Sequence, residues 1–493
     1  MSTERAAAAE RGPVRTRALE QRGWVVALRT LLAFLVVPNV LFLFAGHLTY
    51  LARPLINLDY LMVGLVLGSL PTGALVGVVA LTLVIDTFVT LAPAFHIALD
   101  VALSSLVSLR TASALPIAAV VLLVIAGAAV GASSMVWLAP RQRSGVVSRA
   151  SLLVAAVIVA ALDILGGTSR FSRGATFAPG VNLATSGILV MFDALRSAPR
   201  DAGTTAAPGV APLPSGASAN LLQVLRVSSG ADSIGAQNLV LIIVESLGLP
   251  VDAVDRGRLL EPFSRDGLLR RYRVRSGTIL SHGATTDGEI RELCGVAANH
   301  LQLERVPKAA CLPSLLSRRG FRTMAFHGFT GNLFGRNRWW PQLGFNQVLF
   351  AEDLASTQGT HRCGSMFRGI CDHDIAEIIH KRLVELSGER LFIYWVTLNT
   401  HFPYDVPRTA DSGALCGGLP TLAAHVEACR LARGLGSLFN DIVFVASDSA
   451  LRPTRFLVVG DHSPPFLSGR ERSLFAQDSV PFVDLIPLGS KAR

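Results

Sequence analysis

Long apolar runs fill the chain between residues 24 and 166, a region that is almost free of charged side chains. Residues 24–46, 114–138 and 146–166 are each long enough to cross the hydrocarbon core of a bilayer as a helix. Residues 58–109 are nearly unbroken apolar sequence, with room for two further spans. The pattern therefore predicts a polytopic α-helical membrane domain with about five transmembrane helices over residues 24–166.

A second pattern begins near residue 237, where short apolar runs alternate with amphipathic segments. Four of the apolar runs have the length and composition of buried strands, namely 238–246, 321–328, 391–401 and 454–462. The segments that we expect to be helices are 311–319, 374–387 and 421–438. Alternation of this kind is typical of an α/β layered fold. Residues 237–493 are therefore expected to form one globular domain.

Residues 167–236 join the two domains. Within this region, residues 181–196 are amphipathic enough to lie on a membrane surface. Residues 197–219 are rich in proline, alanine and glycine, which is typical of a linker. We therefore expect a surface helix followed by a flexible connection to the second domain.

The arginine residues indicate how the membrane domain is oriented. Residues 1–23 carry five arginines, and the loop between the last two predicted spans carries Arg141, Arg143 and Arg149 with no acid. Since short basic segments stay in the cytoplasm, residues 1–23 are expected to be a cytoplasmic tail. Five spans then place residues 237–493 on the outer side. The first apolar run is too long for a signal-peptide core, so we expect an uncleaved anchor.

Composition agrees with this division into two parts. Apolar residues make up 51% of the chain and charged residues only 16%, which is unlike an ordinary soluble enzyme. The formal net charge of +10 suits a surface near anionic lipid. No nucleic-acid-binding signature accompanies this charge, so a nucleic-acid partner is not expected.

All six cysteines lie in the second domain and none lies in the predicted spans. An even set confined to one domain suits an oxidising compartment. A zinc knot is the alternative, but no C-x-x-C pair is present to support it. The simplest of the possible disulfide arrangements joins neighbours in the sequence: Cys294–Cys311, Cys363–Cys371 and Cys416–Cys429.

Reactive side chains follow three of the predicted strands. Glu245 ends the first of them, His401 ends another, and the pair Asp461 and His462 ends the last. In open α/β sheets, ligands collect beyond the carboxyl ends of the strands, so these side chains are expected to meet. Two carboxylates and an imidazole form a ligand set that suits Zn²⁺ or Mn²⁺.

The stretch SHGATTDGEI, residues 281–290, places Thr285 and Thr286 after two glycines and before two acids. One interpretation is a polar surface turn. The other is that Thr285 is a nucleophile, because coordination to a divalent cation lowers the pKa of a threonine hydroxyl and supplies the alkoxide. A threonine that opens a helix would also lie near N–H groups able to hold an anion.

Four motifs in this order, NLVLIIVESL, GATTDGEI, TLNTHFPY and VVGDHSPPF, resemble the membrane-anchored branch of the alkaline phosphatase and sulfatase superfamily. That branch includes lipoteichoic acid synthase and lipid A phosphoethanolamine transferase. The similarity covers roughly residues 237–485. It implies an alkaline-phosphatase-like α/β domain with a central mixed sheet. It also implies a multi-pass anchor in a bacterial inner membrane, with residues 237–493 in the periplasm or outside.

The resemblance further implies roles for individual residues. The residues that would bind the metal are Glu245, Thr285, Asp461 and His462. Thr285 would take the phosphoryl headgroup, and His401 resembles a histidine that contacts the phosphate. Arg336, in LFGRNRWWPQLGF, resembles an arginine that clamps the phosphate, and Arg338 is the alternative because its spacing from the aromatic residues is ambiguous.

Thr285 is preferred to Thr286 because it matches the pattern Gly-x-Thr-x-Asp-x-Glu of this branch. No C-x-P-x-R or S-x-P-x-R stretch is present, and a sulfatase needs one to make its formylglycine. Sulfate ester hydrolysis is therefore not expected, despite the common fold. No complete second metal site is evident, although His282, His327 and His380 are candidates for one.

The expected function is metal-dependent transfer of a phospholipid headgroup through a phosphothreonine intermediate to a glycan or lipid acceptor of the cell envelope. The headgroup is phosphoethanolamine or phosphoglycerol, and the cofactor is Zn²⁺ or Mn²⁺. The alternative is a membrane-anchored phosphodiesterase, phosphatase or sulfatase-like hydrolase, in which water replaces the acceptor. A non-enzymatic scaffold is disfavoured by the full set of reactive residues. The sequence leaves open the headgroup, the acceptor and the oligomeric state.

Overall fold

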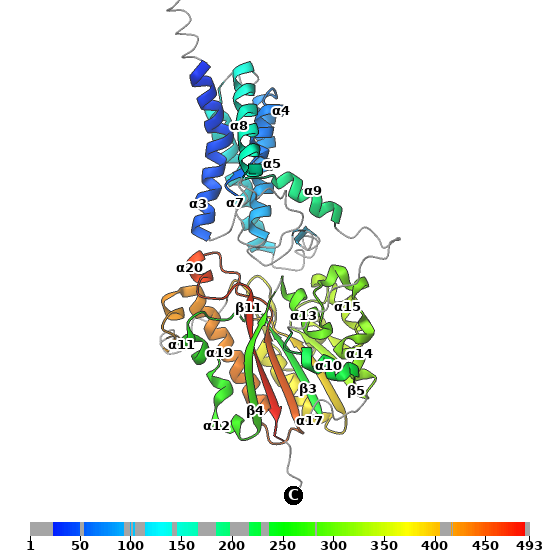
Figure 1. The fold of residues 1–493 in the computed structure, drawn as a ribbon. Coiled ribbons are helices and arrows are strands. Elements are labelled where there is room, and N and C mark those ends of the chain that lie inside the picture. The colour runs from blue at the N-terminus through cyan, green and yellow to red at the C-terminus, as the bar shows by residue number, and fades with distance from the viewer. Residues whose placement is uncertain are drawn as a thin grey trace, which may run out of the picture. The chain divides into compact units, whose positions relative to one another are not determined.

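The computed structural model describes residues 23–49, 54–92, 99, 102–103, 114–140, 145–165, 184–197, 216–227, 236–281, 283–404, 416 and 418–488. The chain divides into two compact units. One is a helical unit in the N-terminal part of the chain, and the other is an α/β unit in the C-terminal part (Figure 1). Each unit is described by itself below.

Four helices of the described part of the helical unit are long and apolar enough to cross a membrane. These spans are Gly23–Phe44, Thr72–Leu91, Val121–Leu138 and Val146–Asp163. The helices of the unit are α3 (Val37–Thr49), α4 (Asp59–Leu67), α5 (Thr72–Leu91), α7 (Ala114–Leu138), α8 (Val146–Leu165) and α9 (Gly187–Ser197), with a π-helical turn at Leu32–Val36 before α3. Their shared core contains Phe34, Tyr60, Leu75, Met135 and Leu152.

Two spans are predicted within residues 58–109. Among the described residues of this range, one helix, α5, is long enough to cross a membrane. Helix α4 has nine residues, so at about 1.5 Å per residue it covers less than half of a hydrocarbon core about 30 Å thick. Residues 93–98 and 104–113 lie outside the described residues. The total of five spans, and the orientation that depends on it, therefore stay predictions.

The predicted surface helix begins later than expected. Residues 184–185 instead form the short strand β2, which pairs in parallel with β1 (Ile56–Asn57), and α9 starts at Gly187. Residues 181–183 lie outside the described residues. The carboxylate of Asp59 fixes the start of α9, because it accepts the backbone N–H of Ile188 at 2.9 Å and the hydroxyl of Ser186. The apolar side chains that α9 exposes are Ile188, Leu189, Phe192 and Leu195.

A mixed sheet of seven strands forms the centre of the α/β unit, in the order β4-β11-β10-β3-β9-β5-β6. The strands are β3 (Asn238–Val244), β4 (Tyr272–Leu280), β5 (Phe321–His327), β6 (Gln347–Leu349), β9 (Arg390–Val396), β10 (Thr454–Gly460) and β11 (Ser479–Pro487). Strand β11 pairs antiparallel with both of its neighbours, and the remaining pairs are parallel. This arrangement confirms the predicted α/β fold with a central mixed sheet.

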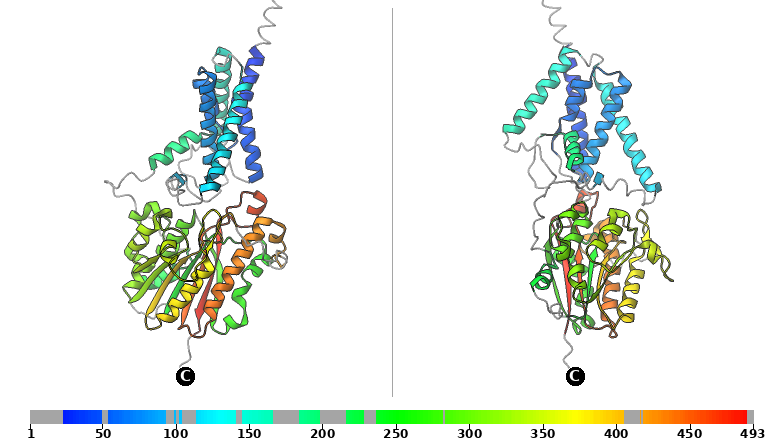
Figure 2. Two further views of the ribbon diagram at one scale, coloured as in Figure 1. Left: turned by 180° about the vertical axis from the view of Figure 1, so that it is seen from behind. Right: turned by 90° about the vertical axis from the view of Figure 1, so that its right-hand side faces the viewer.

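Helices cover both faces of this sheet (Figures 1 and 2). One face carries α11 (Ala253–Leu259), α12 (Asp266–Leu269), α17 (Asp372–Glu385) and α19 (Val426–Ser447). The other carries α10 (Ala219–Val227), α13 (Thr285–Cys294), α14 (Leu312–Ser317) and α15 (Arg336–Gln342). The short helices α16 (Ala351–Leu354) and α20 (Gly469–Arg472) lie in connections, as do the short 3₁₀ turns.

Strand β3 shows why the sequence has an unbroken apolar run at this place. Val240, Ile242 and Val244 pack into the core on one face of the sheet. Leu239, Leu241 and Ile243 pack into the core on the other face. A central strand covered on both faces has no polar side, so its sequence is apolar throughout rather than alternating.

Three disulfides join the pairs predicted from the sequence: Cys294–Cys311, Cys363–Cys371 and Cys416–Cys429. The first links the end of α13 to the residue before α14. The second closes a hairpin of the two short strands β7 (Arg362–Cys363) and β8 (Gly369–Ile370). Each bond joins residues close in sequence, so each fixes a local loop rather than the sheet.

Replacing Cys294 and Cys311 together by alanine is expected to lower the free energy of unfolding by about 3 kcal/mol, because the bond closes a loop of 17 residues in the unfolded chain. Denaturant unfolding of the detergent-purified chain, followed by tryptophan fluorescence, measures the loss. Wild-type protein treated with reductant is the control and should lose at least as much. A loss below about 1 kcal/mol would contradict the expectation.

Candidate active site

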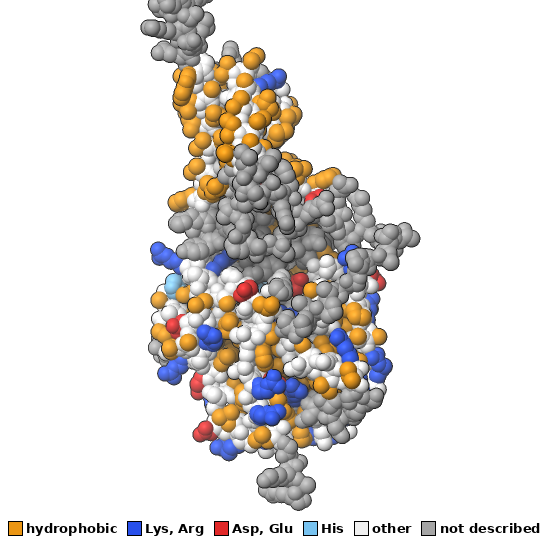
Figure 3. Space-filling view, in the orientation of Figure 1, with side chains coloured by type: hydrophobic (Ala, Val, Ile, Leu, Met, Phe, Trp, Pro, Cys, Tyr) orange, Lys and Arg blue, Asp and Glu red, His pale blue; other side chains and the backbone are white. Residues whose placement is uncertain are grey.

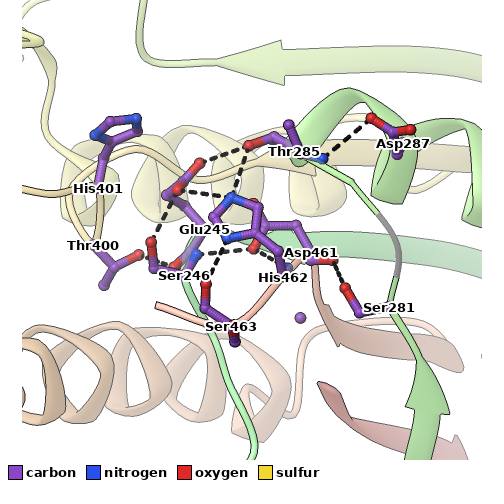
Figure 4. A network of polar contacts seen from close by, with 12 residues as sticks. Glu245, Ser246, Ser281, Thr285, Asp287, Thr400, His401, Asp461, His462 and Ser463 are labelled. Atoms are coloured by element: carbon purple, nitrogen blue, oxygen red, sulfur yellow. Dashed lines mark hydrogen bonds and ion pairs between the residues drawn. The ribbon is translucent and has the colours of Figure 1, made fainter. Parts of the chain in front are cut away.

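The carboxyl ends of β3 and β10 bring three predicted metal ligands together. The two strands are parallel neighbours, with Gly460 opposite Val244 in the register, so the residues that follow them emerge side by side. Ligand atoms of Glu245, Asp461 and His462 all lie within 4.8 Å of one another, and all three residues are buried (Figure 4). The expectation that these strand ends meet is confirmed.

Thr285 joins this cluster from the first position of α13. Its hydroxyl donates to Glu245 Oε2 at 3.1 Å and lies 3.4 Å from His462 Nε2. The hydroxyl of Thr286 is turned elsewhere, to His300 Nδ1 at 3.2 Å. The geometry therefore favours Thr285 over Thr286 as the threonine of the cluster.

The local sequence explains how Thr285 is held at the start of the helix. Gly283 has φ of +73°, and a Cβ at this position would collide with the carboxylate of Asp287. That carboxylate accepts the backbone N–H of Ala284 at 3.2 Å and so caps α13. Gly288, one turn into the helix, lets α13 approach the backbone of Asp461, since a Cβ there would lie 3.1 Å from the Asp461 Cα.

The donor atoms of the cluster fit a divalent cation. His462 Nδ1 lies 2.9 Å from the carbonyl oxygen of Ser463, which can only accept, so Nδ1 carries the proton and the lone pair of Nε2 faces the carboxylates. Asp461 Oδ2 is buried without a hydrogen-bond partner, although His462 Nε2 lies 3.2 Å away. Three lone pairs facing one another are stabilised by a cation, and the set suits Zn²⁺ or Mn²⁺.

Burial and mutual repulsion shape the electrostatics of this cluster. Burial, with the neighbouring Glu245 carboxylate as the next cause, raises the pKa of Asp461 to about 7. Burial also acts to raise the pKa of Glu245, but the imidazoles of His401 and His462, together with hydrogen bonds from Ser246 and Thr285, lower that pKa overall. For His462, burial acts to lower the pKa, but the carboxylates of Asp461 and Glu245, together with the carbonyl oxygen of Ser463 and the carboxylate of Asp287, raise it overall. These opposed shifts show how strongly the groups depend on each other's charge.

Two residues that the sequence analysis missed hold the ligands in place. Ser246 donates its backbone N–H to Asp461 Oδ1 at 2.9 Å and its hydroxyl to Glu245 Oε1 at 3.0 Å. It adopts φ of +57°, which is uncommon for a residue other than glycine. Arg291 is buried and donates to the carbonyl oxygens of Gly460 at 2.8 Å and Asp461 at 3.4 Å. The only signal in the sequence for these two residues was the position of Ser246, directly after the strand-end glutamate Glu245.

Arg336 lies at the start of α15, with only 2% of its surface exposed. Its Nε and Nη2 donate to Glu289 Oε1 at 2.9 and 2.8 Å, and its Nη1 lies 3.4 Å from His327 Nε2. Arg338, the alternative, is exposed. The charge of Arg336 is thus already balanced by the last acid of the α13 motif, and a role in clamping phosphate stays a prediction.

His401 follows β9 in the loop beyond the carboxyl end of that strand. Its Nδ1 donates to the carbonyl oxygen of Phe402 at 2.6 Å. In Figure 4 the ring lies beside Glu245 and apart from the pair Asp461 and His462. His401 is therefore near enough to influence Glu245 electrostatically but is outside the group of metal ligands, and its contact with phosphate stays a prediction.

The candidates for a second metal site do not join into one among the described residues. His282 lies outside the described residues. His327 Nδ1 donates to the carbonyl oxygen of Val396 at 3.0 Å, and His380 Nε2 lies 2.6 Å from a carboxylate oxygen of Asp448. Within the part of the chain that the structure describes, the cluster around Glu245 is the one group of three such side chains close enough to hold an ion.

Comparison with known families shows which family the α/β unit is similar to: residues 237–414 match the Sulfatase family. The α/β unit therefore contains a region, residues 237–414, that is similar to the Sulfatase family. No curated protein matches the chain. The sulfatase-family match begins just before β3 and includes Glu245, Thr285, Arg336 and His401.

Several solved structures are similar to the sulfatase-family domain. Lipoteichoic acid synthase LtaP from Listeria monocytogenes is 16% identical, with 55% of this chain and 72% of that chain covered and a TM-score of 0.37. Phosphoglycerol transferase GacH from Streptococcus pyogenes is 17% identical, with 54% and 72% covered and a TM-score of 0.35. The periplasmic domain of EptC from Escherichia coli, in complex with Zn, is 14% identical, with 51% and 73% covered and a TM-score of 0.34.

Replacing Glu245 by glutamine or Asp461 by asparagine is expected to weaken Zn²⁺ binding by roughly 100-fold or more, since losing even an outer partner of a ligand costs about 10–100-fold. Calorimetric titration of the purified chain with Zn²⁺ and with Mn²⁺ measures the affinity. The matched control is Asp255→Asn, because Asp255 is a buried carboxylate bonded to Thr421 and Leu422 instead. Equal affinities for all three variants and the wild type would contradict the metal site.

The stability of the domain should decrease as the pH is lowered from 6.5 to 4, because of His300. Burial, with the charges of Arg336 and Arg338 in addition, lowers the pKa of His300 to about 4, below the ordinary value of 6.5. The folded chain then binds fewer protons here than the unfolded chain between pH 4 and 6.5, so this contribution to stability is lost as pH falls through that window.

His300→Gln keeps a polar partner for Thr286 but cannot titrate, so it is expected to reduce the drop in melting temperature between pH 6.5 and 4.5. Thermal unfolding of the purified chain across this range gives the measurement. His373→Gln is the control, because the hydrogen bond to Asp441 raises the pKa of His373 and its contribution has the opposite sign. An unchanged profile in His300→Gln would rule out the neutral, buried imidazole.

Proposed function

We propose that this chain transfers the headgroup of a membrane phospholipid, phosphoethanolamine or phosphoglycerol, to a glycan or lipid acceptor of the cell envelope. Thr285 would carry the headgroup between the two halves of the reaction as a phosphothreonine. The observation that supports this most strongly is the hydroxyl of Thr285, which faces Glu245 and His462 at the first turn of a helix. The enzyme class agrees with the sulfatase family of the domain.

The reaction has two displacements at phosphorus. In the first, the oxygen of Thr285 bonds to phosphorus, and the bond from phosphorus to the diacylglycerol oxygen breaks. The Thr285 hydroxyl loses one proton, and the diacylglycerol oxygen gains one. In the second, an acceptor hydroxyl attacks the phosphothreonine, and the oxygen of Thr285 leaves and recovers a proton. A divalent cation held by Glu245, Asp461 and His462 would lower the pKa of the threonine hydroxyl and balance charge on the phosphoryl group.

The residues of the chain supply the remaining chemistry. Glu245 Oε2 accepts the hydrogen bond of the Thr285 hydroxyl and so orients its oxygen. The N-terminus of α13, which begins at Thr285, would favour an arriving phosphoryl group, because helix N-termini bind anions well. His401 would orient the phosphate oxygens or carry the proton, and Arg336, whose charge is shared with Glu289, would contact the phosphoryl group.

The remainder of the chain suits a donor that does not leave the bilayer. The span-length helices tether the domain to the membrane in which the lipid lies. The three disulfides suit the periplasm or another oxidising compartment outside the cytoplasm. We therefore place the protein in the bacterial inner membrane, with its α/β unit on the outer side and Zn²⁺ or Mn²⁺ as its cofactor.

Mass spectrometry of the full-length chain, reconstituted in vesicles of phosphatidylethanolamine or of phosphatidylglycerol, tests the proposal. The wild type is expected to gain the mass of one headgroup phosphate on the peptide that contains Thr285. Thr285→Ala should form no adduct and should lose activity by at least roughly 10³-fold. Thr286→Ala is the matched control and should keep the adduct. An adduct that survives in Thr285→Ala would overturn the assignment of the nucleophile.

The fate of the headgroup separates transfer from hydrolysis. With radiolabelled lipid and an envelope extract as the acceptor, label is expected in the acceptor rather than in free headgroup phosphate. Label that appears only as free headgroup phosphate, with or without the extract, would show that water is the acceptor and that the protein is a phosphodiesterase.

A further inference from the structure

The disulfide-closed hairpin formed by β7 and β8, residues 362–371, has no part in the proposed reaction as described so far. It docks on the carboxyl end of β5, where the backbone N–H of Ile370 donates to the carbonyl oxygen of Gly328 at 2.7 Å. A Cβ at Gly369 would collide with the same carbonyl and with the side chain of Leu398. The hairpin is therefore seated tightly between the loops that follow two neighbouring strands, β5 and β9.

Phe367 projects from this hairpin onto His401. The centroids of the two rings are 4.3 Å apart, with their planes tilted by 56°. Phe367 also makes an edge-on contact with Phe329, with ring centroids 5.7 Å apart. Phe329 follows β5 and is buried, with 4% of its surface exposed, so it forms a fixed wall behind Phe367. The ring of Phe367 thus lies between the core and the imidazole.

The loop that carries His401 is held from a second side by α17, which begins directly after the disulfide. The carboxylate of Asp372 accepts the backbone N–H groups of Leu398 at 3.0 Å and Asn399 at 2.7 Å. The backbone N–H of Asp372 donates to Asn399 Oδ1 at 2.6 Å. The backbone of this loop is therefore fixed by α17, while the imidazole of His401 contacts the hairpin.

The same two segments line one small pocket, with His401 in its wall. Its lining comes from the hairpin at residues 364–367 and from the loop at residues 398–403. Because the hairpin forms the wall that faces the imidazole, loss of that wall would open the pocket to water.

We propose that the hairpin is a positioning device for His401, and that Phe367 is the residue that fixes the imidazole in its working orientation. This inference rests on the proposed function, in which His401 orients the phosphoryl oxygens or carries a proton. With Nδ1 already bound to the carbonyl oxygen of Phe402, Nε2 is the nitrogen left for the substrate. Its direction depends on the rotation of the ring, and Phe367 covers the ring and restricts that rotation.

A direct test measures how accessible the imidazole is. The full-length chain in detergent is treated with diethylpyrocarbonate, and the rate of modification at His401 is followed by mass spectrometry. Phe367→Ala is expected to raise this rate several-fold, and the Cys363→Ser/Cys371→Ser double variant should raise it in the same direction. Arg368→Ala is the matched control, because Arg368 is an exposed neighbour on the same hairpin. An unchanged rate in Phe367→Ala would overturn the inference, whatever the protein catalyses.

A double-mutant cycle tests whether the contact matters for the reaction. Phe367→Ala is expected to lower kcat for headgroup transfer about tenfold, with little change in KM for the lipid and with partial recovery in Phe367→Tyr. In the His401→Ala background, Phe367→Ala should have no further effect, because there is no imidazole left to hold. An equal fall in kcat in both backgrounds would show that Phe367 acts through general stability and would overturn the inference.

The two proposals fail in different ways. If the wild type forms no adduct on Thr285 but Phe367→Ala still exposes His401 to the reagent, the positioning contact stands and the headgroup chemistry is wrong. If the adduct forms and Phe367→Ala changes neither the modification rate nor kcat, the headgroup chemistry stands and the positioning role is wrong.

Discussion

The register between β3 and β10 is the constraint on which the rest of the site depends. With Gly460 opposite Val244, the first residues beyond the two strands are a glutamate and an aspartate, which emerge side by side in a buried place. Two carboxylates in such a place repel each other and lose their hydration, which is costly unless a positive charge compensates them. A shift of the register by one residue would turn one of them to the opposite face of the sheet.

Surrounding groups hold this costly arrangement in place. Ser246 bonds to both carboxylates, and Arg291 fixes the backbone at the end of β10 through two carbonyl oxygens. The α13 helix contributes Thr285 to the cluster and, one turn later, Glu289 to a second buried network. Glu289 accepts hydrogen bonds from Arg336, Trp340 and Tyr394, which links α13 to α15 and to β9. One helix therefore connects the strand-end cluster with the buried network around Glu289.

Much of this could be predicted from the sequence, because buried parallel strands leave a clear signal. The apolar runs at 238–246 and 454–462 are confirmed as strands, and the side chains at their ends meet as expected. The cysteine pairs were also predictable, since each joins sequence neighbours. Strands β4, β6 and β11 of the seven-stranded sheet were not predicted. Strand β4 lies at the edge of the sheet and has exposed positions, so its sequence lacks the continuous apolar run of β3. The helix expected at 421–438 begins at Val426 and continues to Ser447.

Residues that act by long-range contact left no signal in the sequence. In the sequence, Arg291 is indistinguishable from other charged residues of an amphipathic helix. Its hydrogen bond to the backbone of β10 forms only when α13 packs against that strand. In the sequence, Phe367 is one aromatic residue in a short loop. Nothing in the sequence indicates its contact with His401, because the two residues are distant along the chain. For the helical unit, hydrophobicity showed where the apolar segments lie but not that α4 stops after nine residues.

The order of the strands has a consequence for how the enzyme comes into being. Strand β10 lies near the middle of the sheet, between β11 and β3, yet it comes from residues 454–460, late in synthesis. Until the ribosome has released that segment, β3 has one open edge, and Glu245 and Thr285 have neither Asp461 nor His462 beside them. A partly made chain thus holds Glu245 and Thr285 without Asp461 and His462, so the buried cluster is complete only when the sheet closes around its late central strand.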